Sequence, residues 1–257
     1  STGTGSSTRG LTVASQTTFS GVISGTNSGG ITKDGAATLI LTGNNTYAGS
    51  TTISAGTLQV GAGGSTGAIA GAIVDNAALV VNRSDSVAFG NTVSGTGTLA
   101  LNGPGTVTLS ATNSFSGGTS LNNGVLRVGN NAALGGGTLT MNAGRLSSDG
   151  ATARSIANAL VITTDVALGS TTDTGALTLG STVGLGGGTR TLTIDSAVTL
   201  SGVVSNGTLV KSGSGTLALG AANTHSATTL NSGTLALNNA GAAGSGLLTI
   251  NGGSLDN

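Results

Sequence analysis

One sequence pattern recurs three times in this chain, and this internal repetition restricts its fold more than any other feature. Residues 37–61 and 105–129 match without a gap at an offset of 68, and a third copy begins at Gly215. A shorter lead-in precedes each copy. The sequence therefore divides into repeat modules at approximately 19–61, 89–146 and 200–255, with less repeat-like spacers at 62–88 and 147–199. Repetition of this kind favours a fold in which similar units stack on one another.

Within each module, apolar residues alternate with small polar ones. Leu39 with Leu41, and Leu58 with Val60, are examples of this period of two, which is typical of strands with one buried face. Clusters of Gly, Asn, Ser and Asp separate these short runs every 8–12 residues or so, which fits a sandwich, a barrel or a β-solenoid. Only stacked rungs allow modules of unequal spacing to follow one another indefinitely. We therefore predict an all-β chain that forms one single-stranded parallel β-solenoid of about ten to twelve rungs over residues 1–257.

The composition agrees with short strands and excludes a helical protein. Glycine occupies 48 of the 257 positions, all eight acids are aspartates, and Thr, Ser and Asn are abundant, all of which disfavour helix interiors. Disorder is also excluded, because 37% of the residues are apolar and the net charge is zero. Glycine belongs at the corners between strands, where a positive φ is needed. We expect Gly43, Gly49 and Gly61 there, and a repeated corner at Gly56, Gly124 and Gly233.

The charge pattern limits the possible partners. Eight cations balance eight anions and are dispersed along the chain, so no basic surface is expected to attract nucleic acid. No stretch approaches eighteen consecutive apolar residues, which predicts that this segment does not insert into a membrane. The chain has no cysteine and therefore no disulfide. It starts at Ser1-Thr2-Gly3 without a leader, and we expect this start to be a cut within a longer protein.

The residues that recur resemble a known repeat. The first copy contains Ile31-Thr32-Lys33-Asp34-Gly35, then Asn45-Thr46-Tyr47, then Gly56-Thr57-Leu58, and the third keeps the lead-in around Lys211. This pattern is similar to the passenger-associated transport repeat of bacterial autotransporters. The second copy departs from it at Leu101, where the others have lysine, and the third departs at His225, where the others have Tyr47 and Phe115.

The resemblance carries several implications. It implies a right-handed parallel β-helix, exported by the type V route across the outer membrane of a Gram-negative bacterium to the cell surface or the medium, with repeats that aid stacking and transport. No translocator barrel follows the repeats, so a passenger fragment is expected. We interpret it as a structural or adhesive stalk, not an enzyme, whose receptor or glycan the sequence does not identify. Unpaired rungs at the cut ends predict end-to-end self-association.

Candidate chemical residues are few. His225 is the one side chain that ordinarily titrates near neutral pH, but its repeat partners are Tyr47 and Phe115, so a ring filling a corner pocket is favoured over catalysis. Two residues before each ring stands an asparagine, Asn45, Asn113 or Asn223, which is expected to adopt the left-handed conformation in a turn. No catalytic, cofactor-binding or metal-binding residue is assigned, and no cofactor is expected.

Other readings rest on weaker patterns. Asp75 and Asp85 flank Arg83 and are interpreted as part of an exposed loop with an ion pair rather than a metal site. Residues 61–67 lack the lysine of a phosphate-binding loop and are interpreted as a flexible loop. One alternative function is a scaffold for a hydrolase, with the catalytic site either outside this fragment or within 147–199, where six charged residues are widely spread. The other alternative is an ice-binding or self-assembling filament protein.

Overall fold

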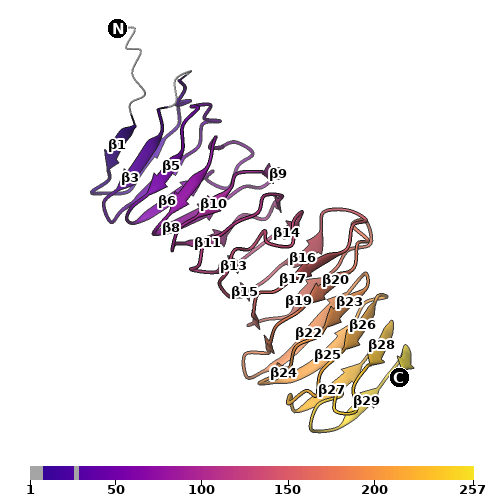
Figure 1. The fold of residues 1–257 in the computed structure, drawn as a ribbon. Coiled ribbons are helices and arrows are strands. Elements are labelled where there is room, and N and C mark those ends of the chain that lie inside the picture. Colours follow the sequence, from indigo (N-terminus) through magenta and orange to yellow (C-terminus); the bar gives the residue numbers. More distant parts are fainter. Residues whose placement is uncertain (1–7, 26–28) are drawn as a thin grey trace, which may run out of the picture.

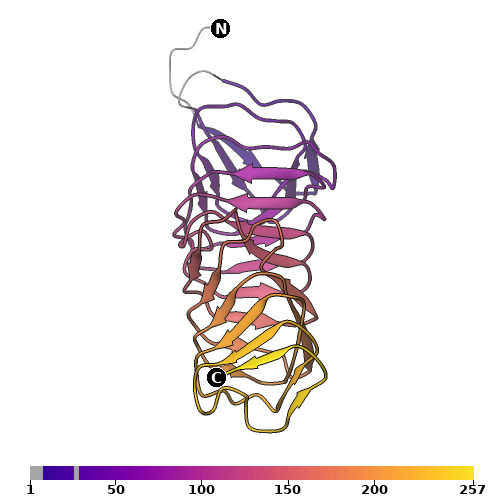
Figure 2. The same ribbon diagram turned by 90° about the vertical axis from the view of Figure 1, so that its right-hand side faces the viewer.

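The computed structural model describes residues 8–25 and 29–257, and over these residues the chain coils into a long stack of short parallel strands. The stack has about 12 turns, with the N-terminal strands at one end and the C-terminal strands at the other (Figures 1 and 2). The described residues contain no helix. The predicted all-β solenoid of ten to twelve rungs is therefore confirmed.

The strands form four parallel sheets, which we number I to IV. Sheet I contains β1 (Arg9–Thr12), β3 (Ile31–Asp34), β5 (Thr51–Ile53), β7 (Ile73–Asp75) and β10 (Val93–Ser94). Sheet II contains β2 (Thr17–Phe19), β4 (Thr38–Leu41), β6 (Thr57–Val60), β8 (Ala78–Val81), β11 (Thr98–Leu101), β13 (Thr119–Leu121), β15 (Leu139–Met141), β18 (Leu160–Ile162), β21 (Val183–Gly184) and β24 (Val204–Ser205).

The other two sheets begin further along the chain. Sheet III contains β9 (Ser86–Phe89), β12 (Thr106–Leu109), β14 (Val125–Val128), β16 (Arg145–Ser148), β19 (Val166–Leu168), β22 (Thr189–Ile194), β25 (Thr208–Ser212), β27 (Ala227–Leu230) and β29 (Leu248–Ile250). Sheet IV contains β17 (Arg154–Ile156), β20 (Leu177–Leu179), β23 (Val198–Leu200), β26 (Thr216–Leu219), β28 (Thr234–Leu237) and β30 (Ser254–Asp256).

Each turn visits three faces in a constant order. Sheet I at the N-terminal end and sheet IV at the C-terminal end take the same place in this order, after sheet III and before sheet II. We call the position that sheets I and IV share face 1, the position of sheet II face 2, and the position of sheet III face 3. Some turns have strands on two faces only. Face 3 has none before β9, face 1 has none between β10 and β17, and face 2 has none after β24 within the described residues.

The length of a turn follows from the strand pairing. Paired residues lie 19 positions apart between Leu192 and Lys211, and 26 positions apart between Val166 and Leu192. Most other pairs lie about 20 apart, as between Leu99 and Thr119. This variation explains why the modules can have unequal spacing, because a longer turn bulges outward at a corner while its strands keep their pairing.

Aliphatic side chains fill the interior in columns that run along the stack. One column on face 2 consists of Leu41, Val60, Val81, Leu101, Leu121, Met141 and Ile162. Every member is at most 2% exposed. Burial of one such side chain contributes about 1.5–3 kcal/mol, and its neighbours above and below make the same contribution. The alternation seen in the sequence therefore predicted the inward residues correctly.

Glycines at the corners allow adjacent turns to approach closely. Gly56, Gly124 and Gly233 have φ values of 66°, 72° and 72°, in the left-handed region that favours glycine. A Cβ atom at Gly124 would lie 2.3 Å from the carbonyl oxygen of Gly105 in the turn below, so steric contact as well as conformation requires glycine. Gly61 also has a positive φ, whereas Gly43 and Gly49 are not among the glycines with positive φ, contrary to expectation.

Candidate functional site

Two lysines lie completely inside the solenoid, which the sequence analysis did not foresee. Lys33 and Lys211 are both 0% exposed, and each ammonium group reaches a corner where backbone carbonyls converge. Lys33 Nζ donates to the carbonyl oxygens of Asp34 (3.1 Å), Gly35 (2.6 Å) and Ala55 (2.8 Å). Lys211 Nζ makes the same three bonds in the third repeat, with the carbonyl oxygens of Ser212 (3.1 Å), Gly213 (2.9 Å) and Ser232 (2.8 Å).

Burial lowers the pKa of both ammonium groups, that of Lys211 to about 8. The carbonyl partners provide the hydrogen bonds that a buried cation requires. The sequence signal that could have identified these residues is a lysine in an inward-facing position of an alternating strand, followed two residues later by glycine, as in Lys33 and Gly35.

The second repeat has Leu101 at this position, and its corner differs in conformation. Gly35 and Gly213 have φ values of 80° and 81°, but Gly103 is not among the residues with positive φ. Pro104 follows Gly103, and a residue before proline is restricted to extended conformations. The carbonyl cradle of the other two repeats therefore depends on a backbone conformation that the Gly103-Pro104 corner does not adopt.

The three asparagines of the repeats are buried and bond to the turns on either side of them. In each, Oδ1 accepts a backbone N–H of the turn below and Nδ2 donates to a carbonyl of the turn above. The donor and acceptor residues are Ile23 (2.7 Å) and Ala68 (2.8 Å) for Asn45, Val93 (2.8 Å) and Ala133 (2.6 Å) for Asn113, and Val204 (2.7 Å) and Ala242 (2.7 Å) for Asn223. The predicted left-handed conformation is wrong, because Asn206 (φ 58°) is the non-glycine residue with positive φ in the described part of the chain.

The ring positions Tyr47, Phe115 and His225 are 3%, 0% and 0% exposed. The Tyr47 hydroxyl bonds to the hydroxyl of Thr51, and Nε2 of His225 lies 2.6 Å from Oγ1 of Thr228. Burial lowers the pKa of His225, which favours the neutral imidazole. In the second repeat Phe115 offers no polar atom, and the equivalent hydroxyl of Thr119 has no hydrogen-bond partner.

The predicted ion pair forms between Arg83 and Asp85, but Arg83 itself is buried and not exposed as expected. It is 6% exposed and pairs with Asp85 at 2.8 Å. Nη1 of Arg83 donates to the carbonyl oxygen of Gly67, and Nη2, which also pairs with Asp85, donates to that of Ser65 at 2.6 Å. Arg83 thereby fastens the glycine-rich loop at 61–67, which the sequence alone had suggested to be a flexible loop.

Asp75 takes no part in this ion pair. Its side chain points inward, in register with Ile53 and, one turn further, Lys33. Its Oδ1 accepts the backbone N–H of Ala77 at 3.0 Å, while Oδ2 is buried without a partner. Burial raises the pKa of this carboxyl group to about 6. The alternation of Ile73 and Asp75 was the available sequence signal for this inward position.

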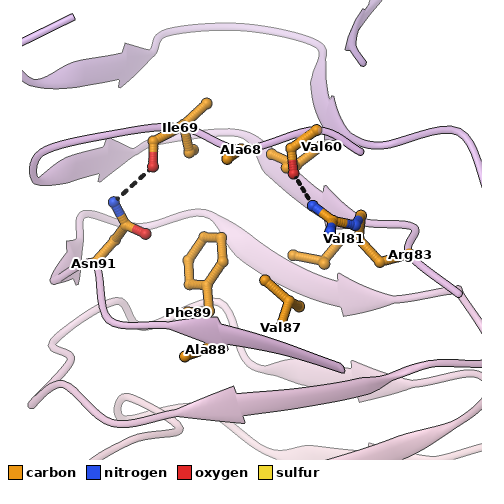
Figure 3. Close-up of a pocket in the computed structure, with 10 residues that line it drawn as sticks. Val60, Ala68, Ile69, Val81, Arg83, Val87, Ala88, Phe89 and Asn91 are labelled. Carbon is orange, nitrogen blue, oxygen red and sulfur yellow. Dashed lines mark hydrogen bonds between the residues drawn. The ribbon is translucent and has the colours of Figure 1, made fainter. Parts of the chain in front are cut away.

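A cavity of about 40 Å³ lies beside Arg83, between the corner residues 67–69 and strands β6, β8 and β9. Figure 3 shows Phe89 and Val60 among its lining residues and Asn91 bonded to the carbonyl oxygen of Ile69, a distance of 3.2 Å. Sites for small molecules have volumes of about 300–1,000 Å³, so this space suits a solvent molecule at most.

The charged residues of the spacer 147–199 form ion pairs and hydrogen bonds that fasten loops and neighbouring turns. The pairs are Arg127 with Asp173 (2.8 Å), Arg145 with Asp195 (2.7 Å) and Arg154 with Asp149 (2.7 Å). Asp165 accepts the backbone N–H of Thr191 at 2.8 Å, and Arg190 donates to the carbonyl oxygen of Thr189 at 3.0 Å. Among the described residues no group of three or more His, Asp or Glu side chains is arranged to hold a metal ion.

Outward-facing amides form ladders along the surface. Nδ2 of Asn122 donates to Oδ1 of Asn102, and Nδ2 of Asn142 donates to Oδ1 of Asn122, both at 2.7 Å. Thr163 continues the row by donating to Oδ1 of Asn142 at 2.7 Å. This asparagine ladder, Asn102, Asn122 and Asn142, leaves polar atoms at a regular spacing on the exposed side of the rod and is the candidate contact surface.

The chain is similar to known exported proteins. The passenger-associated-transport-repeat family model matches residues 31–60, 102–128 and 209–237. Each matched range contains one of the three buried repeat asparagines and one ring position. A stretch of 56 residues is 54% identical to the adhesin BmaC autotransporter of Brucella suis, covering 22% of this chain and 2% of the length of that protein. No solved structure matches the chain. No helix in the described residues is long and apolar enough to cross a membrane.

Proposed function

Because the chain carries three passenger-associated transport repeats within one unbroken solenoid, we propose that it is a structural and adhesive stalk segment of an autotransporter passenger and has no catalytic role. Proteins of this kind are exported across the outer membrane to the cell surface or beyond it. The stalk holds a more distant part of the passenger away from the cell and presents its own polar surface to neighbouring surfaces.

The observation that carries this proposal is the continuity of the stack. Parallel pairing runs from β1 to β30 through all three repeats and both spacers, so that no separate globular unit interrupts the described part of the rod. Nearest-neighbour stacking of this kind produces an elongated particle whose length increases with every turn. A rod suits a spacer, and its regular surface suits repeated weak contacts.

The surroundings of the titratable groups support a non-catalytic role. His225 is buried against Thr228, Asp75 is enclosed in the interior, and Asp173 is paired with Arg127. General acid–base catalysis requires such groups to reach a substrate. These side chains instead bond within and between turns, which is the use expected of them in a stalk.

The adhesive part of the proposal is tested with beads that carry the purified chain. Their attachment to cultured host cells under flow is compared with that of beads carrying the triple variant Asn102→Ala, Asn122→Ala, Asn142→Ala. Because the ladder is exposed, far-UV circular dichroism is expected to remain unchanged while attachment falls several-fold. Equal attachment of both beads would remove the ladder from the contact surface, and no attachment by either bead would refute adhesion.

The non-catalytic part is tested separately. The chain is incubated with panels of glycan, peptide and ester substrates, with His225→Phe as the matched control. We expect no turnover above background in either sample. Turnover by the original chain that disappears in the variant would replace the stalk proposal with an enzymatic one.

A further inference from the structure

The three repeat asparagines occupy the faces that have no strand. Asn45 lies between β4 and β5, on face 3 before sheet III begins, and Asn113 lies between β12 and β13, on face 1 in the gap between sheets I and IV. Asn223 lies between β26 and β27, on face 2 beyond the last strand of sheet II. Each repeat therefore has strands on two faces and a buried amide on the third.

On these faces no strand continues, and the side-chain amide adds to isolated backbone bonds between turns, such as those from the N–H groups of Asn113 and Ser114. Where two strands pair, every second residue bonds to the neighbouring turn through its backbone. On the strandless face of the second repeat, the Asn113 side chain joins Val93 of the turn below to Ala133 of the turn above, with bonds of 2.8 and 2.6 Å. One side chain thus connects three successive turns at a point where regular strand pairing is interrupted.

Comparison of the copies identifies the amide as the constant member of this arrangement. The inward lysine becomes Leu101 in the second copy, and the ring changes from Tyr47 to Phe115 to His225. The asparagine and its two inter-turn bonds are the same in all three. Opening a turn beside the asparagine breaks these side-chain bonds in addition to the backbone bonds of the same turn, which raises the cost of opening there.

We propose that Asn45, Asn113 and Asn223 are clamps that divide the rod into mechanical blocks. A solenoid pulled from its ends opens at its weakest turn and continues turn by turn, because each turn contacts only its neighbours. A clamp stops this process until the force is high enough to break it, and the chain up to the next clamp then opens together. The two internal blocks therefore run from position 45 to position 113 and from position 113 to position 223.

Single-molecule stretching of the chain, held at its two ends, tests this proposal. At about 3.4 Å per extended residue, the blocks predict contour-length increments of about 230 Å and about 370 Å. In Asn113→Ala the boundary between the blocks disappears, and a single increment of about 600 Å is expected. The matched control, Asn122→Ala, removes an outward-facing amide of the same type and is expected to leave both increments in place.

Several results would overturn the proposal. The amides do not set the boundaries if the original chain unfolds one turn at a time throughout, or if it unfolds in a single event. The same conclusion follows if Asn113→Ala gives the same contour-length increments as the original chain. If Asn113→Ala does not fold, Asn113→Asp keeps the acceptor for Val93 but loses the donor to Ala133, and it is then expected to lower the rupture force at that boundary. Hydrogen exchange of the Val93 amide provides an independent readout: it is expected to accelerate at least tenfold in Asn113→Ala, which removes the acceptor, but not in Asn122→Ala.

Discussion

Replacement of Asp75 by asparagine is expected to stabilise the protein at neutral pH and to have little effect in acid. The carboxyl group is buried with Oδ2 unpartnered, and its pKa is raised from 3.8 to about 6. The folded state therefore holds this proton more tightly than the unfolded state does. Stability from this group is fully present below pH 3.8, declines as the pH rises toward 6, and is absent above it.

The size of the effect follows from the pKa shift. A shift of about two units corresponds to about 3 kcal/mol, at 1.36 kcal/mol per unit, which is an upper value for the gain in Asp75→Asn at pH 8. Asparagine keeps an oxygen to accept the Ala77 N–H and carries no charge at any pH. Near pH 4 the carboxyl is protonated in the folded state and partly protonated in the unfolded state, so the two proteins should differ much less in stability than at pH 8.

Urea unfolding followed by far-UV circular dichroism at pH 4, 5, 6, 7 and 8 provides the measurement. The difference in unfolding free energy between Asp75→Asn and the original chain should grow with pH and level off above pH 6. Asp85→Asn is the matched control, and its effect on the unfolding free energy should have the opposite sign. Hydrogen bonds from Arg83 lower the pKa of the Asp85 carboxyl group, so the substitution removes a stabilised charge. A difference that is constant with pH, or largest at pH 4, would refute the assignment of Asp75 as a buried carboxyl group whose ionisation is disfavoured by desolvation.

Four further predictions concern other parts of the molecule. His225→Phe should unfold at equal or higher urea concentration, with the largest gain in stability below pH 6.5. Burial lowers the pKa of the folded-state imidazole, so the original chain loses stability where the unfolded-state imidazole takes up a proton. A loss of more than about 2 kcal/mol in the variant would contradict this. Leu101→Lys should cost about 3–5 kcal/mol because its ammonium finds no cradle, and adding Pro104→Ser, which copies Ser214, should recover part of that loss in the same assay. Thermal melts with EDTA and with millimolar calcium should coincide, since aliphatic columns, hydrogen bonds and ion pairs such as Arg145 with Asp195 hold the turns. A shift of more than about 5 °C would reveal a metal site. Sedimentation of the isolated chain over a hundredfold concentration range should reveal end-to-end association, because β29 and β30 each pair on one side only and Leu247 and Ile250 are 73% and 50% exposed; a single monomer boundary throughout would argue against it.

The sequence predicted the solenoid because two signals agreed. The alternation at positions such as Leu39 and Leu41 specified strands with one buried face, and the threefold repeat excluded folds that close after a fixed number of strands. Both signals are local in sequence and arise from the same packing that stacks the turns. This is why the inward columns could be predicted before the structure was known.

The polar interior was harder to foresee. Lys33, Arg83 and Asp75 belong to residue types that are usually exposed, and average behaviour places them on the surface. The burial of Lys33 and Arg83 depends on where backbone carbonyls converge at a corner, which is a property of two adjacent turns and not of either alone. Asp75 instead accepts the backbone N–H of Ala77. The conformation of Asn113 was mispredicted for the same reason, because its partners Val93 and Ala133 lie 20 residues away on either side.

The unequal spacing of the repeats determines how the rod presents itself to a binding partner. Neither the interval from Asn45 to Asn113 nor that from Asn113 to Asn223 is a whole number of turns, which is why the clamps lie on three different faces. A feature carried on the outer surface of every repeat would then point in three directions around the axis. Such a stalk could engage a partner whichever way it happened to be turned, whereas one with repeats aligned on a single side would first have to rotate toward it.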